Sequence, residues 1–301
     1  MLSLFLNERG EIRSGWRVAV FILAFTFAAV LLGTLGQVTM SAIGIGQSSG
    51  TYLIINAILS LIPAILIGWV CGRIFEHLPY RALGAAFAEN WLKNWVAGAV
   101  MGSATLGFAV IVAYTFGRLR FEISAANTSA IFSSLAISFA VFAAASAFEE
   151  ALFRGYILQT FSRAGYAWLA ILLTSVFFGA VHFGNPNASI FSTLNTILAG
   201  VWFSIAYLKT RDLWFVWGLH LMWNWVQGSI FGIEVSGLTN ITTTPLLREI
   251  DSGPTWLTGQ TYGIEGGVAC TIAITVSIVA VHFLPVLKPD EELLAMTSAS
   301  R

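Results

Sequence analysis

The chain has 301 residues, of which 57% are hydrophobic and only 10% are charged. Soluble domains carry about 25% charged residues, so this chain has too few to cover a surface that faces water. The composition indicates an integral membrane protein whose outer surface contacts lipid. The formal net charge is zero, so nothing suggests a nucleic acid partner.

Eight stretches are apolar and long enough to cross a bilayer, which takes about 20 residues. In chain order they cover residues 16–38, 52–72, 95–117, 129–161, 166–183, 190–208, 213–231 and 266–287. We therefore predict an all-α polytopic membrane bundle with about eight transmembrane helices. The third stretch has Gly98 and Gly102 at a spacing that permits close helix approach.

The distribution of Lys and Arg predicts the orientation of the chain. With eight spans, most of these residues fall in loops on the same side as both termini, and the other side holds Arg118, Arg120 and Arg248. Positive charge accumulates in the cytoplasm. We therefore expect both termini to be cytoplasmic, in the plasma membrane of a prokaryote. The fourth stretch is too long for one perpendicular crossing, and we expect it to project into the cytoplasm.

A small group of polar side chains lies within or at the end of the apolar stretches. Ionisable groups inside a membrane cost several kcal/mol and usually mark a functional site. The fourth, fifth and seventh stretches supply the candidates, which are Glu149, Glu150, Arg154, His182, His220 and Asn224.

Helix geometry assigns these residues to faces. Glu150 and Arg154 are one helical turn apart and can form an ion pair. His220 and Asn224 have the same spacing and share one face of their helix. Glu149 points about 100° away from Glu150, so the two carboxylates have separate roles.

The turn between the fourth and fifth stretches predicts which side chains meet. Glu149 lies about 15 residues before the turn near 163–165, and His182 lies about 17 residues after it, so both reach a similar height. Antiparallel helices would bring the two side chains face to face.

These residue types are suited to activating water. A carboxylate in a site of low dielectric constant can act as a general base, and a nearby His can hold the same water or a metal ion. A second His with an Asn supplies donors for an oxyanion. Cys71 and Cys270 have no CxxC spacing and no His nearby in the sequence, so we predict buried free thiols rather than nucleophiles or metal ligands.

Three motifs resemble those of the CPBP family of intramembrane proteases, which covers CAAX prenyl endopeptidases and bacteriocin-processing or immunity (Abi) proteins. They are EExxxR at Glu149–Arg154, FxxxH at Phe178–His182 and HxxxN at His220–Asn224. The resemblance covers about residues 129–231. It divides the chain into an N-terminal region with three transmembrane helices (1–128), a catalytic core (129–231), and an extracytoplasmic loop with the last transmembrane helix (232–301).

The resemblance implies a hydrolase that cleaves a peptide bond of a membrane-associated or lipidated protein or peptide near the cytoplasmic side. Glu149 would activate water, His182 would position it, and His220 and Asn224 would stabilise the oxyanion. Glu150 and Arg154 would shape the site. The family is commonly described as metalloproteases, although a metal-free glutamate mechanism is also proposed for it. Zn²⁺ bound by Glu149, His182 and His220 therefore stays open.

Two other classes of function stay open as well. A transporter or channel could use the same polar residues to bind an ion or relay protons. A non-catalytic immunity or scaffold protein could have kept the fold alone. The expected partners in every case are membrane lipid and, for the protease, a peptide or protein substrate.

Overall fold

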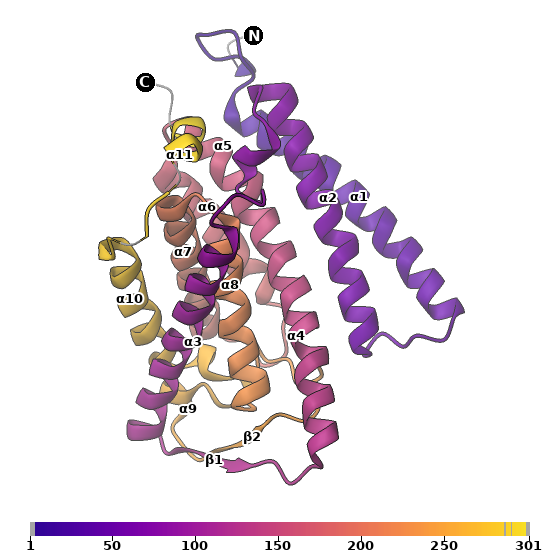
Figure 1. Ribbon diagram of the computed structural model, residues 1–301, viewed down its shortest axis with the longest axis vertical. Coiled ribbons are helices and arrows are strands. Elements are labelled where there is room, and N and C mark those ends of the chain that lie inside the picture. Colours follow the sequence, from indigo (N-terminus) through magenta and orange to yellow (C-terminus); the bar gives the residue numbers. More distant parts are fainter. Residues whose placement is uncertain (1–3, 286, 290, 299–301) are drawn as a thin grey trace.

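The computed structural model describes residues 4–285, 287–289 and 291–298, and helices dominate it (Figure 1). Each of the eight predicted stretches forms a helix. The helices are α1 (Ser14–Ala42), α2 (Gly50–Glu76), α3 (Trp91–Phe116), α4 (Thr128–Glu150), α5 (Leu158–Arg163), α6 (Ala167–His182), α7 (Ile190–Thr210), α8 (Leu213–Trp225), α9 (Thr255–Thr258), α10 (Val268–Phe283) and α11 (Glu291–Thr297).

Five helical runs within the described residues are long and apolar enough to cross a membrane. They are α1, α2, α3, the continuous run Thr128–Arg163 and α7. Helices α6 and α10 are apolar but have only 16 residues each, and α8 has 13 residues before it continues through the π-helical segment Val226–Ile230. Glycine and proline explain part of this shortening, because Gly184 and Pro186 follow α6 and Gly267 precedes α10. The chain is an integral membrane protein, and helix length supports five spans.

The helices differ in how much protein surrounds them. Helices α1 and α2 form a hairpin at one side of the bundle, and α7 and α8 lie near its centre (Figure 1). Only 11% of the apolar window of α1 is buried, against 50% for α7. Most of α1 therefore faces lipid, whereas α7 and α8 form the interior on which a site can be built.

Helices α3 and α8 contact each other backbone to backbone through glycines. A Cβ at Gly98 would lie 1.9 Å from the carbonyl oxygen of Phe215, and one at Gly102 would lie 2.1 Å from that of Leu219. From the other side, a Cβ at Gly218 would lie 2.3 Å from the carbonyl oxygen of Trp95. The predicted close approach is thus confirmed, and α3 fixes the position of α8.

A single helical rod carries the two adjacent glutamates. Helix α4 continues through a π-helical segment, Ala151–Ile157, into α5. Glu149 and Glu150 end the α-helical part, immediately before the π-helical turns. Segments of this kind occur often at functional sites, because the extra residue per turn redirects the side chains.

The end of the bundle opposite the termini is closed by a small β-ribbon (Figure 1). Strands β1 (Leu119–Ile123) and β2 (Leu247–Asp251) pair antiparallel, with Phe121 opposite Glu249. The prediction of an all-α protein was incomplete here. The segments that form β1 and β2 connect helices and lie outside the apolar stretches. Their pairing provides hydrogen bonds for backbone N–H and C=O groups that have no partner within a helix.

The Gly102 contact predicts a stability effect. Replacing Gly102 by Leu should lower the free energy of unfolding by about 1–3 kcal/mol or more, because the side chain meets the α8 backbone and cannot be accommodated. Gly107→Leu is the matched control, since a Cβ there has nothing within 4 Å. Thermal unfolding in detergent measures both; equal loss in the two variants would contradict the contact.

Glu249 predicts a dependence of stability on pH. Burial, followed by repulsion from Glu234 and Asp251, raises the pKa of Glu249 from 4.5 to about 8. The folded state therefore disfavours the ionised form, so stability is highest below pH 4.5 and falls as the pH rises towards 8. Glu249→Gln should weaken this fall in unfolding temperature between pH 5 and 9. Glu122→Gln, which removes an exposed ion pair with Arg248, should leave the fall in place.

Candidate functional site

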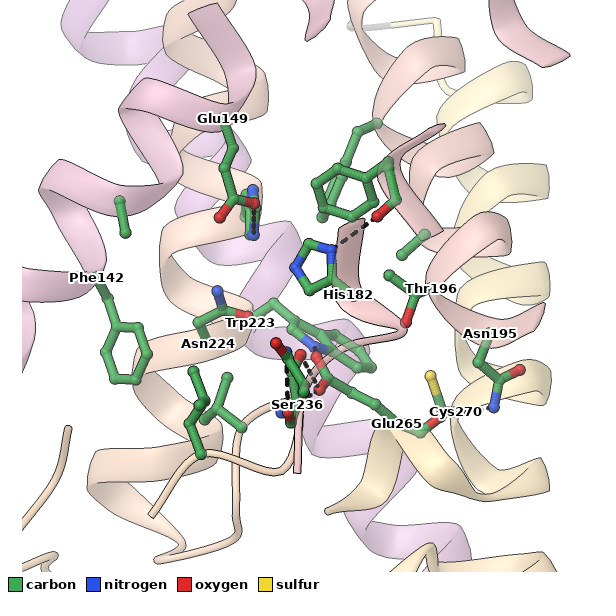
Figure 2. Close-up of a pocket in the computed structure, with 18 of the residues that line it drawn as sticks. Phe142, Glu149, His182, Asn195, Thr196, Trp223, Asn224, Ser236, Glu265 and Cys270 are labelled. Atoms are coloured by element: carbon green, nitrogen blue, oxygen red, sulfur yellow. Dashed lines mark hydrogen bonds and ion pairs between the residues drawn. The ribbon is translucent and has the colours of Figure 1, made fainter. Parts of the chain in front are cut away.

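A cavity of about 100 Å³ lies between α4, α6, α7 and α8, which is room for several water molecules. Four of the six candidate residues line it: Glu149, His182, His220 and Asn224. Glu149 and His182 face each other across the space, with Asn224 below Glu149 (Figure 2). The predicted meeting of Glu149 and His182 is confirmed.

The Glu149 carboxylate is partly exposed to the cavity. Its side chain is 24% exposed, and its Oε2 atom makes no hydrogen bond with any described group. The nearest basic group is Nε2 of His220, at 3.8 Å. The Glu149 carboxylate therefore borders the cavity, while its Oε2 atom is buried without a hydrogen bond.

Glu150 lies behind this cavity in a dry ion pair. Its Oε1 accepts hydrogen bonds from Nη1 of Arg154 at 3.1 Å and from Nδ1 of His220 at 2.7 Å. Both Glu150 and Arg154 are almost fully buried, at 1% and 0% exposure. Arg154 also donates from Nη2 to the carbonyl oxygen of Gly200 in α7. The predicted pair is confirmed, and it joins α4, α7 and α8 at one point.

Aromatic rings connect the ion pair to the two histidines. The Arg154 guanidinium lies over the rings of Phe178 and Phe203, at 4.9 and 5.2 Å from their centroids. Phe203 stacks on the His220 ring at 4.5 Å, and Phe178 contacts the His182 ring at 4.7 Å. The guanidinium thus fixes two rings that in turn orient the imidazoles.

The hydrogen bonds determine which imidazole nitrogens face the cavity. Nδ1 of His182 lies 2.7 Å from the carbonyl oxygen of Phe178, which can only accept, so Nδ1 carries the proton. In the neutral ring Nε2 of His182 is then an acceptor. His220 likewise directs Nδ1 to Glu150 and Nε2 towards Glu149. Phe178 and Glu150 act as the orienting partners of the two histidines.

The site lies away from the face of the bundle that carries the termini, which is the face expected to be cytoplasmic. His182 ends a helix of 16 residues that begins near the face carrying the termini, which places it about 22 Å from that face. The cavity is also lined by Ser236 and Glu265 of the connection between α8 and α10. The site therefore lies inside the bundle rather than at the face of the termini, and the projection of the fourth stretch into the cytoplasm stays a prediction.

Several residues outside the motifs contribute to the cavity. Glu265 accepts from Nε1 of Trp223 at 3.1 Å and from the backbone and hydroxyl of Ser236. Cys270 lines the cavity as well, and it is a buried free thiol as predicted. Glu265 lies in a polar connection and belongs to no motif. Neither hydrophobic periodicity nor residue spacing therefore distinguished it from an ordinary loop residue.

The donor types suit a zinc ion, because two histidine Nε2 atoms and one carboxylate face the same space. Their arrangement does not. Among the described residues no group of three or more His, Cys, Asp or Glu side chains lies close enough to hold a metal ion. We derive no step through a metal, and the zinc site stays a prediction.

A comparison with protein families shows what this core is similar to. Residues 130–226 match the family model of type II CAAX prenyl endopeptidase Rce1-like proteins. This segment is similar to the CAAX protease core of the CPBP family, which supports the resemblance carried by the three motifs. The match includes all three motifs and ends before the connection that carries Glu265. The family is a family of proteases, which supports protease activity in general. No curated protein matches the chain.

Loss of Arg154 should destabilise the core of the bundle severely. Arg154→Leu leaves Glu150 buried without its cation, which typically costs about 3–5 kcal/mol. The exposed pair of Arg248 with Glu122 provides the control, and Arg248→Leu should cost less than about 1 kcal/mol. Thermal or denaturant unfolding of the purified variants measures the difference. Similar losses would show that the buried pair does not hold the core together.

Proposed function

We propose that the chain is an intramembrane endopeptidase that hydrolyses a peptide bond of a membrane-associated or lipidated protein with water activated by Glu149. The observation that supports this most directly is the Glu149 carboxylate, which borders a cavity shared with His182, His220 and Asn224 and has no hydrogen bond at Oε2. The family match to Rce1-like proteases supports the same reaction class.

In the proposed reaction, a water lies between Glu149 and His182. It donates one hydrogen bond to the Glu149 carboxylate and one to Nε2 of His182. As the oxygen attacks the substrate carbonyl carbon, its proton passes to Glu149. The C–N bond then breaks, and Glu149 delivers that proton to the leaving amine. One carboxylate thus serves as base and then as acid.

The negative charge on the carbonyl oxygen needs donors. The Asn224 amide lines the same cavity and can donate directly. We assign the second donor to Nε2 of a doubly protonated His220; the two carboxylates Glu149 and Glu150 together balance the charges of His220 and Arg154. Arg154 and Glu150 then act on the reaction through the position and charge of His220.

Two neighbouring groups offer other chemistries. The Cys270 thiol lines the cavity, but no hydrogen bond joins it to either histidine among the described contacts, so a cysteine nucleophile has no base. Zinc held by Glu149, His182 and His220 is the other alternative. Metal analysis of the purified wild type and of His182→Ala tests it, because a resident zinc ion would be present in the first and diminished in the second.

The proposed setting is a prokaryotic plasma membrane with both termini in the cytoplasm and eight crossings, three of them by the short helices α6, α8 and α10. The cleaved bond then enters the bilayer to about the middle of the bundle. A substrate anchored in the membrane meets this requirement, because its backbone already lies at that depth.

Glu149→Gln should lower peptide cleavage by about 10²–10⁴-fold, since the amide cannot accept the proton from water. His182→Ala should lower it as well, and Cys270→Ala should not. Cleavage of membrane-anchored peptides by protein purified in detergent measures this, with Glu122→Gln as the surface control. Full activity in Glu149→Gln would exclude the mechanism.

Two other outcomes would favour the rival functions. Solute uptake that depends on Glu149, without peptide cleavage, would favour a transporter. An unchanged cellular phenotype in Glu149→Gln would favour a non-catalytic scaffold.

A further inference from the structure

A second carboxylate, Glu265, faces the same cavity from the connection between α8 and α10 (Figure 2). Its Oε1 accepts from Nε1 of Trp223 at 3.1 Å. Its Oε2 accepts from the backbone nitrogen of Ser236 at 2.6 Å and from the Ser236 hydroxyl at 2.7 Å. Both oxygens are therefore engaged, whereas Oε2 of Glu149 has no hydrogen bond, so Glu265 is suited to hold structure rather than to transfer a proton.

The turn that Glu265 holds has an unfavourable backbone. Ser236 has a φ of 50° and Gly237 a φ of 77°, two successive left-handed residues between the bridged Val235 and Leu238. Such a conformation is common for glycine but costly for serine. The two hydrogen bonds from Ser236 to Glu265 offset that cost, which makes the turn dependent on the carboxylate.

Other contacts hold the same turn in place. The backbone nitrogen of Gly237 donates to the carbonyl oxygen of Tyr262, and Nδ2 of Asn185 donates to that of Ser236. A Cβ at Gly237 would lie only 1.9 Å from the carbonyl oxygen of Pro186. The turn is thus wedged between the loop after His182 and the segment that carries Glu265.

This turn forms one wall of the cavity. Val235, Ser236 and Leu238 line it, on the side away from the face of the termini. Through Trp223, Glu265 also contacts α8 at the residue before Asn224. One carboxylate therefore connects the wall of the cavity to the helix that supplies the proposed oxyanion donors.

We propose that Glu265 is a positioning residue, which fixes the turn Val235–Leu238 as the wall against which a substrate peptide lies between Glu149 and Asn224. The kinetic part of this inference rests on the proposed function, whereas the structural part does not. Glu265 lies outside the matched segment 130–226.

Cys270 provides a readout that needs no activity. Its side chain lines the cavity behind the wall and is 1% exposed. Asn195 connects the two regions, because its Nδ2 donates to the carbonyl oxygens of Glu265 and Gly267 at the start of α10. Opening of the wall should expose the Cys270 thiol to a reagent in water. Cys71 lies in a separate cluster with Phe21 and serves as a control for the fold.

The experiment uses the full chain in detergent with Cys71 replaced by Ala. N-ethylmaleimide labelling of Cys270 is timed without substrate, and KM and kcat are measured on a membrane-anchored peptide. Glu265→Ala should raise the labelling rate on the order of tenfold or more, and it should raise KM by a similar factor with a smaller change in kcat. Glu265→Gln keeps an acceptor for Ser236 and should fall between Glu265→Ala and the parent.

Three controls make the result interpretable. Ser236→Gly adopts the left-handed turn freely and keeps its backbone hydrogen bond, so it should label nearly as slowly as the parent. Glu149→Gln should lose cleavage but keep slow labelling. In a Cys270→Ala background, slow labelling of Cys71 in Glu265→Ala shows that the fold is intact.

Slow labelling of Cys270 in Glu265→Ala would overturn the inference, whatever the activity. A collapse of kcat with KM unchanged would also overturn it, because Glu265 would then act in the chemistry. If no variant, the parent included, cleaves any peptide, the proposed function fails, and the labelling rates still decide whether Glu265 holds the wall.

Discussion

The buried ion pair between Glu150 and Arg154 is the interaction on which the site depends. It is expensive to place two charges in a dry interior, and only dense hydrogen bonding makes this tolerable. Here the carboxylate also bonds His220, and the guanidinium bonds Gly200 and covers two aromatic rings. Three helices consequently meet at one fixed point, and both imidazoles take their orientation from it.

Around this point, three carboxylates have three different environments. Glu150 is dry and paired through Oε1, Glu265 accepts hydrogen bonds on both oxygens, and Glu149 is partly exposed and borders the cavity. The same functional group thus serves as a structural charge, as a support for a turn, and as the proposed base. Environment, rather than residue type, separates these roles.

The sequence was sufficient for the helices and for most of the site. Periodicity placed Glu150 against Arg154, and counting from one turn brought Glu149 opposite His182, because both arguments need only approximate helix geometry and tolerate the π-helical segment Ala151–Ile157. It was insufficient where contacts are made by loops. The β-ribbon, the Ser236 turn and Glu265 come together from segments far apart in the chain, and no local spacing encodes that. The sequence also did not predict that α6 and α10 are short, since hydropathy does not show where a helix ends.

The π-helical segment Ala151–Ile157 has a consequence for how the long rod can be used. An extra residue in a turn shifts the phase of everything that follows it. The lower half aims Glu149 at the cavity, and the upper half aims Arg163 at Glu76 of α2, 2.7 Å away. The rod therefore behaves as two helices on a common axis, each aimed independently. One half can hold the lipid-facing hairpin in place without dictating the direction of the other.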